Sequence, residues 1–238
     1  MSEQSWAPRR FWKEAGVAPR EGGHAVLLDG RPVRTPAKAP LVLPTGALAE
    51  AIAAEWDAQG ERVDPGTMPM TRTANSAIDT VAANRDAVID LLAEYGATDL
   101  LCYRADAPEE LAARQAADWD RWLDWADRTH GARLKVATGV LPVAQDARAL
   151  AALRAPLEGM DAFALAGTHD LVALPGSLVL GLAVAGGALA ADEAWRISRI
   201  DEDWQAELWG ADDEAEAQAS ARKAALEQAA RFHTLSRA

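Results

Sequence analysis

The chain has 238 residues, half of them hydrophobic, and its 36 acidic and 24 basic side chains give a formal charge of −12. This length and composition are ample for a buried core in one or two domains. The acidic balance argues against general nucleic-acid binding and against electrostatic docking on anionic membranes, because both need a basic surface. Excess acid usually serves solubility, although it also attracts a basic partner surface.

The first sixty residues combine strand-like runs with turn signals. In "HAVLLDGRPVRTPAKAPLVLP", alternating or β-branched runs are broken at Asp29–Gly30, a pair typical of a tight hairpin turn. The pattern predicts strands at 24–28, 31–35 and 41–43. Thr45 then caps a helix that stops at Gly60, and residues 61–70 form a connector rich in proline and glycine.

Beyond residue 70 the pattern is mainly helical. Apolar periodicity predicts helices at 71–82, 84–94, 108–129, 146–157, 160–173, 177–185, 189–209 and 212–234. Residues 99–105 and 132–138 fit short strands or extended connectors. The sequence therefore predicts an α+β protein, with a small β-rich N-terminal domain at 1–66 and a larger, mainly α-helical domain at 67–238.

One uncharged stretch, residues 171–191, is long enough to span a bilayer. Pro175–Gly176 and Gly186–Gly187 divide it, and no cluster of basic residues flanks it to set an orientation. We therefore predict a buried central helix at about 177–185 and no membrane insertion. The first residues contain no apolar core of a signal peptide, so secretion is not expected.

Metal and cofactor sites have no support in the sequence. The single cysteine, Cys102, excludes an internal disulfide and any site with several cysteines, and its apolar neighbours predict a buried, inert thiol. No histidine pair has the spacing of a helical metal site, and neither a Walker lysine loop nor a GxGxxG motif after a strand is present. We expect no metal and no cofactor.

His169 and Asp170, with Ser177 downstream, raise the alternative of a small-molecule hydrolase. Neighbouring residues on a helix point about 100° apart, so we expect no hydrogen bond between His169 and Asp170. Ser177 also lies outside a GxSxG elbow. A hydrolase that uses His169 or the acidic residues is kept as the second hypothesis.

Tryptophan is abundant, with nine residues in the chain. Trp119, Trp122 and Trp125 step by three along one predicted helix, which fits a bulky core stripe or a partly exposed binding surface. Trp56 continues the apolar stripe of its own helix, eight residues after Leu48. We therefore predict structural roles for Trp56 and its neighbour Asp57.

The segment "RISRIDEDWQAELWG", residues 196–210, combines two tryptophans with several acids. At helical spacing, one stripe is predicted to face the core, formed by Ile197, Ile200, Trp204 and Leu208. The acidic residues then lie on another face, where they could serve catalysis, a metal, a partner or solubility. Aromatic anchors beside acids favour a partner, and the residues that we expect to bind it are Glu202, Trp204, Glu207 and Trp209.

Six blocks in order carry a resemblance that runs from about residue 9 to 232: "RRFWKEAGV", "LDGRPVRTPAKAPLVLPT", "LAEAIAAEWDAQGERVDPGTMPMTRTANSAID", "YGATDLLCYRAD", "HDLVALPGSLVLGLAV" and "SRIDEDWQAELWG". Together they resemble the family of assembly chaperones for the alpha subunit of the catalytic head of F-type ATP synthase.

The resemblance implies a chaperone that uses no ATP, is not an enzyme, and holds the unassembled alpha subunit until the beta subunit takes its place. It also implies a β-containing N-terminal domain joined to a helical domain. The expected location is the bacterial cytoplasm, or the mitochondrial matrix in eukaryotic relatives, and the expected state is a monomer. A third hypothesis is a purely structural oligomer subunit, which would self-associate without binding alpha.

Overall fold

The computed structural model describes residues 8–139, 141–210 and 212–238. The chain forms two compact units. The first takes the chain up to Arg85 together with Asp161–Ala166 and Arg231–Ala238, and the second takes Asp86–Met160 and Gly167–Ala230. A small sheet in the N-terminal part is followed by a mostly helical part, which confirms the predicted α+β class. The single domain boundary at residue 66 stays a prediction.

The sheet of the first unit is antiparallel and is centred on β2, which pairs with the other three strands. Its strands are β1 (Ala15–Arg20), β2 (Gly23–Leu28), β3 (Arg31–Pro32) and β4 (Val42–Leu43). Asp29 and Gly30 both have positive φ, as a type I′ hairpin turn requires, and Leu28 pairs with Arg31 across it. The hairpin prediction is confirmed, and the strand predicted at 31–35 is shorter than expected.

Strand β1 was missed in the sequence because "AGVAPR" contains glycine, alanine and proline, which are poor strand formers. Its strand conformation comes from pairing with β2 over its full length, from Ala15 opposite Leu28 to Arg20 opposite Gly23. This strand is therefore defined by its pairing with another segment of the chain and not by the strand preference of its own residues.

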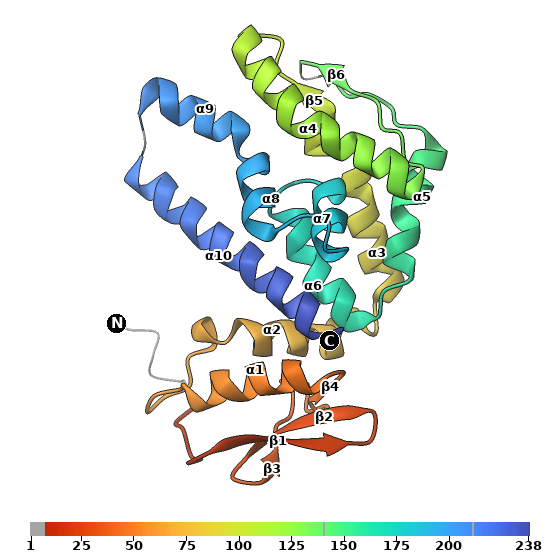
Figure 1. The fold of residues 1–238 in the computed structure, drawn as a ribbon. Coiled ribbons are helices and arrows are strands. Elements are labelled where there is room, and N and C mark those ends of the chain that lie inside the picture. Colours follow the sequence, from red (N-terminus) through yellow and green to blue (C-terminus); the bar gives the residue numbers. More distant parts are fainter. Residues whose placement is uncertain (1–7, 140, 211) are drawn as a thin grey trace. The chain divides into compact units, whose positions relative to one another are not determined.

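Helix α1 (Gly46–Asp57) covers the sheet, and α2 (Pro69–Ser76) packs on the other side of α1 (Figure 1). The 3₁₀ turn η2 (Pro65–Thr67) lies between the two helices in the chain, and the π turn η3 (Ala77–Val81) follows α2. The hydroxyl of Thr45 accepts a hydrogen bond from the amide of Leu48 at 3.1 Å, so the predicted helix cap is confirmed. Residues of the sheet and of α1 share one apolar core, to which the end of the chain contributes Phe232.

Trp56 is half-buried, packs against this core and meets the ring of Trp12 edge-on, with centroids 5.2 Å apart. The exposed carboxylate of Asp57 accepts a hydrogen bond from Arg10 at 3.1 Å. Arg10 also donates to the main-chain carbonyls of Asp57 at 2.7 Å and Gln59 at 2.6 Å. These contacts attach the N-terminal segment to the end of α1; the structural roles of Trp56 and Asp57 stay a prediction, tested below.

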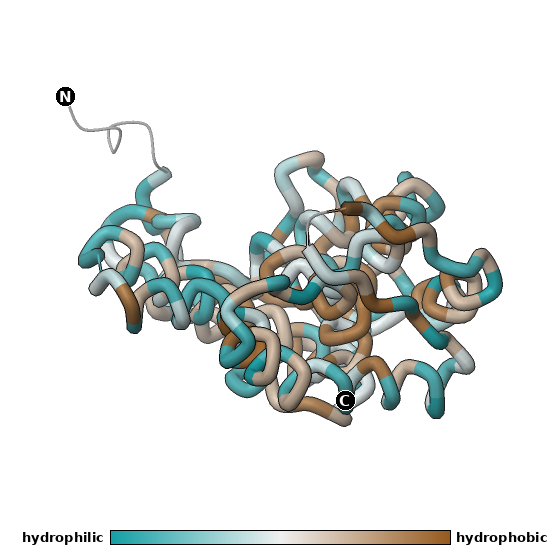
Figure 2. Tube along the Cα trace, turned by 90° about the horizontal axis from the view of Figure 1, so that it is seen from above, coloured by the Kyte–Doolittle hydropathy of each residue, from teal (hydrophilic) through white to brown (hydrophobic). Residues whose placement is uncertain are grey.

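The rest of the chain is dominated by helices: α3 (Arg85–Glu94), α4 (Glu109–His130), α5 (Ala147–Glu158), α6 (Ala162–Ala173), α7 (Leu178–Ala185), α8 (Ala191–Ser198), α9 (Ile200–Trp209) and α10 (Asp213–Leu235). Colouring the trace by hydropathy shows apolar and hydrophilic stretches alternating along many of its turns (Figure 2). Such alternation is typical of helices that bury one face.

Short elements connect these helices. The 3₁₀ turns are η4 (Tyr95–Ala97) and η5 (Leu100–Cys102), and the strands β5 (Tyr103–Arg104) and β6 (Ala137–Thr138) pair in parallel. The two segments that fitted strands or connectors therefore form a two-residue strand pair. Cys102 is fully buried, and burial raises the pKa of its thiol to about 12, which confirms the prediction of an inert cysteine.

Helix α7 is buried from Leu178 to Ala183, as predicted for a central helix. Within the described ranges, no helix is long and apolar enough to cross a membrane. The buried carboxylate of Asp99 accepts the amide of Leu101 at 3.1 Å and that of Val179 at 3.0 Å. Asp99 thus joins the start of η5 to the start of α7, and burial raises its pKa to about 6.

The helix predicted at 189–209 is two helices, α8 and α9, separated at Arg199. Neither proline nor glycine lies at this break. Instead, the indole Nε1–H of buried Trp119 donates to the main-chain carbonyl of Ile197 at 2.9 Å, the group that an uninterrupted helix would offer to residue 201. The Ser198 hydroxyl donates to the carbonyl of Trp195 at 2.9 Å, a local bond that also competes with the helical pattern.

Replacing Trp56 tests the packing of the first unit. Trp56→Arg places a charge against the apolar core, and we expect it to lower the free energy of unfolding by about 3 kcal/mol or more. Trp56→Phe is the matched control: it keeps a ring and removes a buried indole N–H that has no partner among the described residues. We expect Phe to cost about 1–2 kcal/mol. Equal melting temperatures for wild type and Trp56→Arg would contradict this prediction.

Asp99 should make stability depend on pH. Its folded pKa of about 6 exceeds the ordinary 3.8, so the folded protein holds this proton more tightly than the unfolded chain. The resulting stabilisation is complete below about pH 4 and is lost as the pH rises through 6. The Asp99→Asn variant lacks this titration. We therefore compare the unfolding free energies of wild type and variant at each pH. The difference, wild type minus variant, should fall by roughly 2–3 kcal/mol as the pH rises from below about 4 to above 6. A difference that does not change with pH would contradict the prediction.

Candidate partner-binding site

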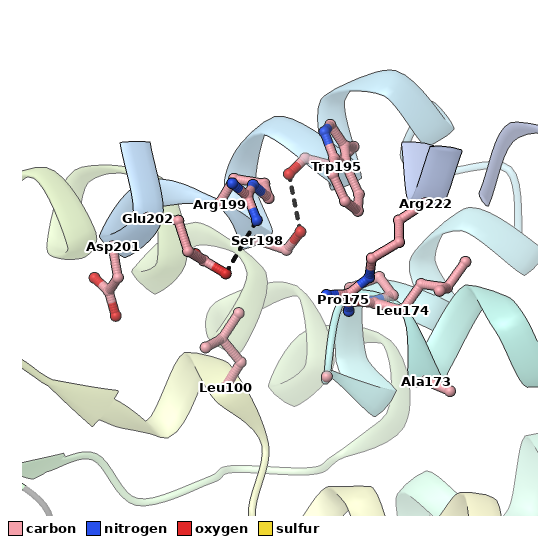
Figure 3. A pocket seen from close by; sticks show the side chains of 11 residues that line it. Leu100, Ala173, Leu174, Pro175, Trp195, Ser198, Arg199, Asp201, Glu202 and Arg222 are labelled. Carbon is pink, nitrogen blue, oxygen red and sulfur yellow. Dashed lines mark hydrogen bonds and ion pairs between the residues drawn. The ribbon is translucent and has the colours of Figure 1, made fainter. Parts of the chain in front are cut away.

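A groove is lined by residues of α8, α9 and the first half of α10. The three helices can be located in Figure 1. We name this groove the α9/α10 groove; its volume is about 560 Å³. It is lined by Trp195, Arg199, Glu202, Asp203, Gln205, Ala206, Trp209, Gly210, Asp212, Ala215, Glu216, Gln218, Ala219 and Arg222. A second hollow of about 270 Å³ shares four of these residues and extends to the turn after α6, at Leu174, Pro175 and Gly176 (Figure 3).

The groove carries four carboxylates and two arginines among its lining residues. Both arginines contact the protein itself. Arg199 lies 3.3 Å from the carboxylate of Glu202 and 5.4 Å above the ring of Trp195. Arg222 donates to the main-chain carbonyl of Leu174 at 3.0 Å (Figure 3). The groove therefore has an excess of negative charge, which suits a basic ligand surface.

Both walls of the groove are exposed. Trp209 is 79% exposed, and every described residue from Asp212 to Gln218 is exposed. Burying an aromatic ring of this size against a partner would contribute several kcal/mol. The C-terminal end of α9 and the N-terminal part of α10 therefore present surface that is available to a partner.

The predicted core stripe of this segment is wrong in its second half. Ile197 and Ile200 are buried, but Trp204 is only half-buried and Leu208 is 57% exposed. The reason is the break at Arg199. The prediction of this stripe took residues 189–209 as one continuous helix, whereas α9 is a separate helix that extends beyond the core.

The opposite face of α9 packs against α4. The guanidinium of Arg114 lies 4.9 Å from the ring centre of Trp204 and donates to both carboxylate oxygens of Glu207, at 2.7 and 3.0 Å. These hydrogen bonds lower the pKa of Glu207. Gln115 on α4 donates to the carboxylate of Asp201 at 2.6 Å. This face of α9 is therefore held by an arginine and an amide of α4.

The four residues predicted to bind a partner thus fall into two pairs. Glu202 and Trp209 line the groove, whereas Trp204 and Glu207 contact α4. The structure does not bring all four to one surface.

Helix α8 is attached to α4 by an ion-pair network that sequence reasoning missed. Arg196 donates to Asp118 at 2.8 and 3.0 Å and to Glu193, and Arg121 donates to Glu193 at 2.9 Å. The two arginines lower the pKa of Glu193 to about 2. Partners more than seventy residues apart leave no local signal. Arg199, Arg222 and Glu216 of the groove were also missed, because helical periodicity does not show that α8, α9 and α10 line one groove.

The helix of Trp119, Trp122 and Trp125 combines both roles that were considered for it. Trp119 is fully buried, as a core residue should be. Trp122 and Trp125 are half-buried and meet edge-on, with ring centroids 6.1 Å apart. A second aromatic surface therefore lies on α4, less exposed than Trp209.

The residues of the hydrolase hypothesis do not form a triad. His169 Nδ1 lies 2.9 Å from the carboxylate of Asp170, so the expectation that the two could not pair is wrong; both side chains are about half-exposed and are free to lean together. Asp170 raises the pKa of His169. Ser177 is fully buried and accepts the amide of Leu180 at 3.0 Å as the cap of α7. Among the residues that the structure describes, no cluster of three or more His, Cys, Asp or Glu could hold a metal.

Comparisons with known proteins agree on one family. Residues 9–127 match the family described as ATP12 chaperone protein. The crystal structure of Atp12 from Paracoccus denitrificans is 56% identical with a TM-score of 0.93, and the match covers 96% of this chain and 98% of that one. An aspartate-to-lysine mutant of Atp12p from the same bacterium is 55% identical, with a TM-score of 0.94 and the same coverage.

Two further relatives are more distant. The Atu1473 protein of Agrobacterium tumefaciens is 45% identical with a TM-score of 0.90, over 96% of this chain and 85% of that one. The mitochondrial protein atp12 of Schizosaccharomyces pombe is 23% identical over 219 residues, which cover 87% of this chain and 75% of the relative.

Charge reversal on α9 should distinguish the two faces of this helix. Glu207→Lys removes the bidentate partner of Arg114 and adds a like charge, so we expect a modest fall in melting temperature. Glu202→Lys breaks a single contact, and Asp203 remains near Arg199, so its melting temperature should match wild type. Exchanging the charges in an Arg114→Glu/Glu207→Lys double variant should recover part of the loss. Thermal melting of the four proteins provides the measurement, and a double variant no better than Glu207→Lys would contradict the pairing.

Proposed function

The chain belongs to the ATP12 chaperone family, a family of ATP synthase assembly chaperones, and we propose that it binds the unassembled alpha subunit of the ATP synthase catalytic head. It protects that subunit, without using ATP, until the beta subunit takes its place. The observation that carries the proposal is the match with Paracoccus Atp12 at 56% identity over 96% of the chain.

The groove supplies what a holding chaperone needs. An unassembled subunit exposes surface that is normally buried against its neighbours, and a chaperone covers it with apolar anchors inside a polar rim. In the groove, exposed Trp209 is the aromatic anchor and Glu202 is part of the acidic rim. We propose that Glu202 and Trp209 contact the alpha subunit directly, while Trp204 and Glu207 hold α9 in place against α4.

Neither alternative is favoured by a specific observation. A Ser–His–Asp triad would lack its nucleophile, because Ser177 is buried and caps α7. We propose that the protein is not an enzyme, needs no cofactor and acts as a monomer. For a bacterial source we propose the cytoplasm; the relatives found include bacterial proteins and one named as mitochondrial.

Light scattering during refolding of isolated alpha subunit tests the proposal. At equimolar concentration and without nucleotide, wild-type protein should suppress the scattering from aggregation. Glu202→Lys should suppress it much less while it keeps the wild-type melting curve, because a reversed rim charge slows association with a basic surface. The matched control is Glu21→Lys, which reverses an exposed charge in the β1–β2 turn and should behave as wild type.

No suppression by wild type would contradict the proposed function. Equal suppression by wild type and Glu202→Lys would contradict binding through Glu202, and the aromatic surface of α4 at Trp122 and Trp125 would be the next to test.

A further inference from the structure

We propose that the α9/α10 groove receives an arginine side chain of the partner, with its guanidinium stacked on Trp209 and paired with the carboxylate of Glu216. The inference deepens the proposed function and rests on it for the identity of the partner. The chemistry of the site can be tested without that partner.

Trp209 differs from the other tryptophans of the described chain. Five of them have an arginine guanidinium 4.9–5.5 Å from the ring centre: Trp12, Trp119, Trp122, Trp195 and Trp204. Trp56 and Trp125 instead meet aromatic rings edge-on. Among the described residues, neither an arginine nor an aromatic ring packs against the indole of Trp209. The residue is 79% exposed, so its ring is available to a partner.

The same helix already binds an arginine in the proposed manner. On the α4 side of α9, the Arg114 guanidinium lies over Trp204 while both of its terminal nitrogens donate to Glu207. The aromatic face attracts the cation, and the carboxylate fixes its plane through two parallel hydrogen bonds. An arginine from another segment can therefore dock on α9 through one tryptophan and one carboxylate.

The groove side of α9 offers the same two groups. Trp209 provides the ring, and the carboxylate comes from across the groove, on α10. Glu202 and Asp203 lie near Arg199, and Asp212 accepts the amides of Glu214 and Ala215 at the start of α10.

Glu216 is the groove acid that remains available. Its side chain is exposed and, among the described residues, has no hydrogen bond or ion pair. Three of the residues that line the groove with it have small side chains: Ala206, Ala215 and Ala219. A partner main chain can therefore approach closely enough for a long side chain to reach both Trp209 and Glu216.

Arginine fits this site better than lysine does. Its planar guanidinium stacks on an indole and donates two hydrogen bonds to one carboxylate, whereas the ammonium of lysine is a strongly hydrated point charge. An acidic partner segment would be repelled by the excess of carboxylates. The groove thus selects a segment of the alpha subunit that exposes an arginine beside apolar residues.

Indole N–H signals in ¹H–¹⁵N NMR spectra of the protein alone provide the test. The Trp209 signal is assigned by its loss in Trp209→Phe. The probes are three blocked peptides, Ala-Leu-Arg-Ala-Leu and its citrulline and lysine versions; citrulline keeps the shape of arginine without its charge. The arginine peptide should shift the Trp209 signal saturably, about tenfold more tightly than citrulline and several-fold more tightly than lysine.

Glu216→Gln should weaken binding of the arginine peptide about fivefold. Its matched control is Glu214→Gln, an exposed residue of the same helix that does not line the groove, and it should bind as wild type. The inference is overturned if no shift appears up to about 10 mM peptide, if citrulline or lysine binds equally well, or if both glutamine variants behave alike.

Capture of alpha subunit separates this inference from the proposed function. If wild type and Glu216→Gln capture alpha equally, the arginine site fails and the proposed function stands. If wild type does not capture alpha, the proposed function fails, and the peptide titration still decides whether the groove binds arginine.

Discussion

The hydrogen bond between the buried indole of Trp119 and the main-chain carbonyl of Ile197 determines the geometry of the candidate site. In an uninterrupted helix this carbonyl would accept the amide of residue 201. Because it accepts the indole instead, α8 ends at Ser198 and a separate helix, α9, begins at Ile200. Without this break, the predicted stripe would have carried Leu208 into the core. With it, α9 leaves the core, and a groove opens between α9 and α10.

Ion pairs and stacking keep α9 in this exposed position. The apolar contact of α9 is small, since Ile200 is its buried residue. Arg114 compensates through its stack on Trp204 and its bidentate contact with Glu207, and Arg196 holds the preceding helix to Asp118. Exposed pairs of this kind are individually weak, so several are needed to orient one helix. The helix is thereby positioned through one face while the other face stays open to a partner.

Local signals predicted much of the fold, and contacts between distant segments account for the errors. The Asp29–Gly30 turn, the Thr45 cap and the buried helix α7 each depend on neighbouring residues. Strand β1, by contrast, exists through pairing with β2, and the break at Arg199 follows from a hydrogen bond between Trp119 and Ile197, which are seventy-eight residues apart. Helical periodicity could place acids and tryptophans on one segment, but it could not show that α4 covers Trp204 and Glu207. The candidate site was therefore found by its composition, and its division into two faces required the structure.

In the proposed function the protein hands its client to another subunit, so it must bind without holding permanently, and a groove of this composition would suit that role. Its charges are exposed, so their attraction to a basic surface acts over a Debye length and speeds encounter, while water screens the final contacts. Trp209 adds apolar area at a single position and does not form a continuous dry interface. Most of the affinity would then reside in one or two anchors, and losing an anchor raises the dissociation rate most. A beta subunit that competes for the same surface would need to displace only those anchors to release the client.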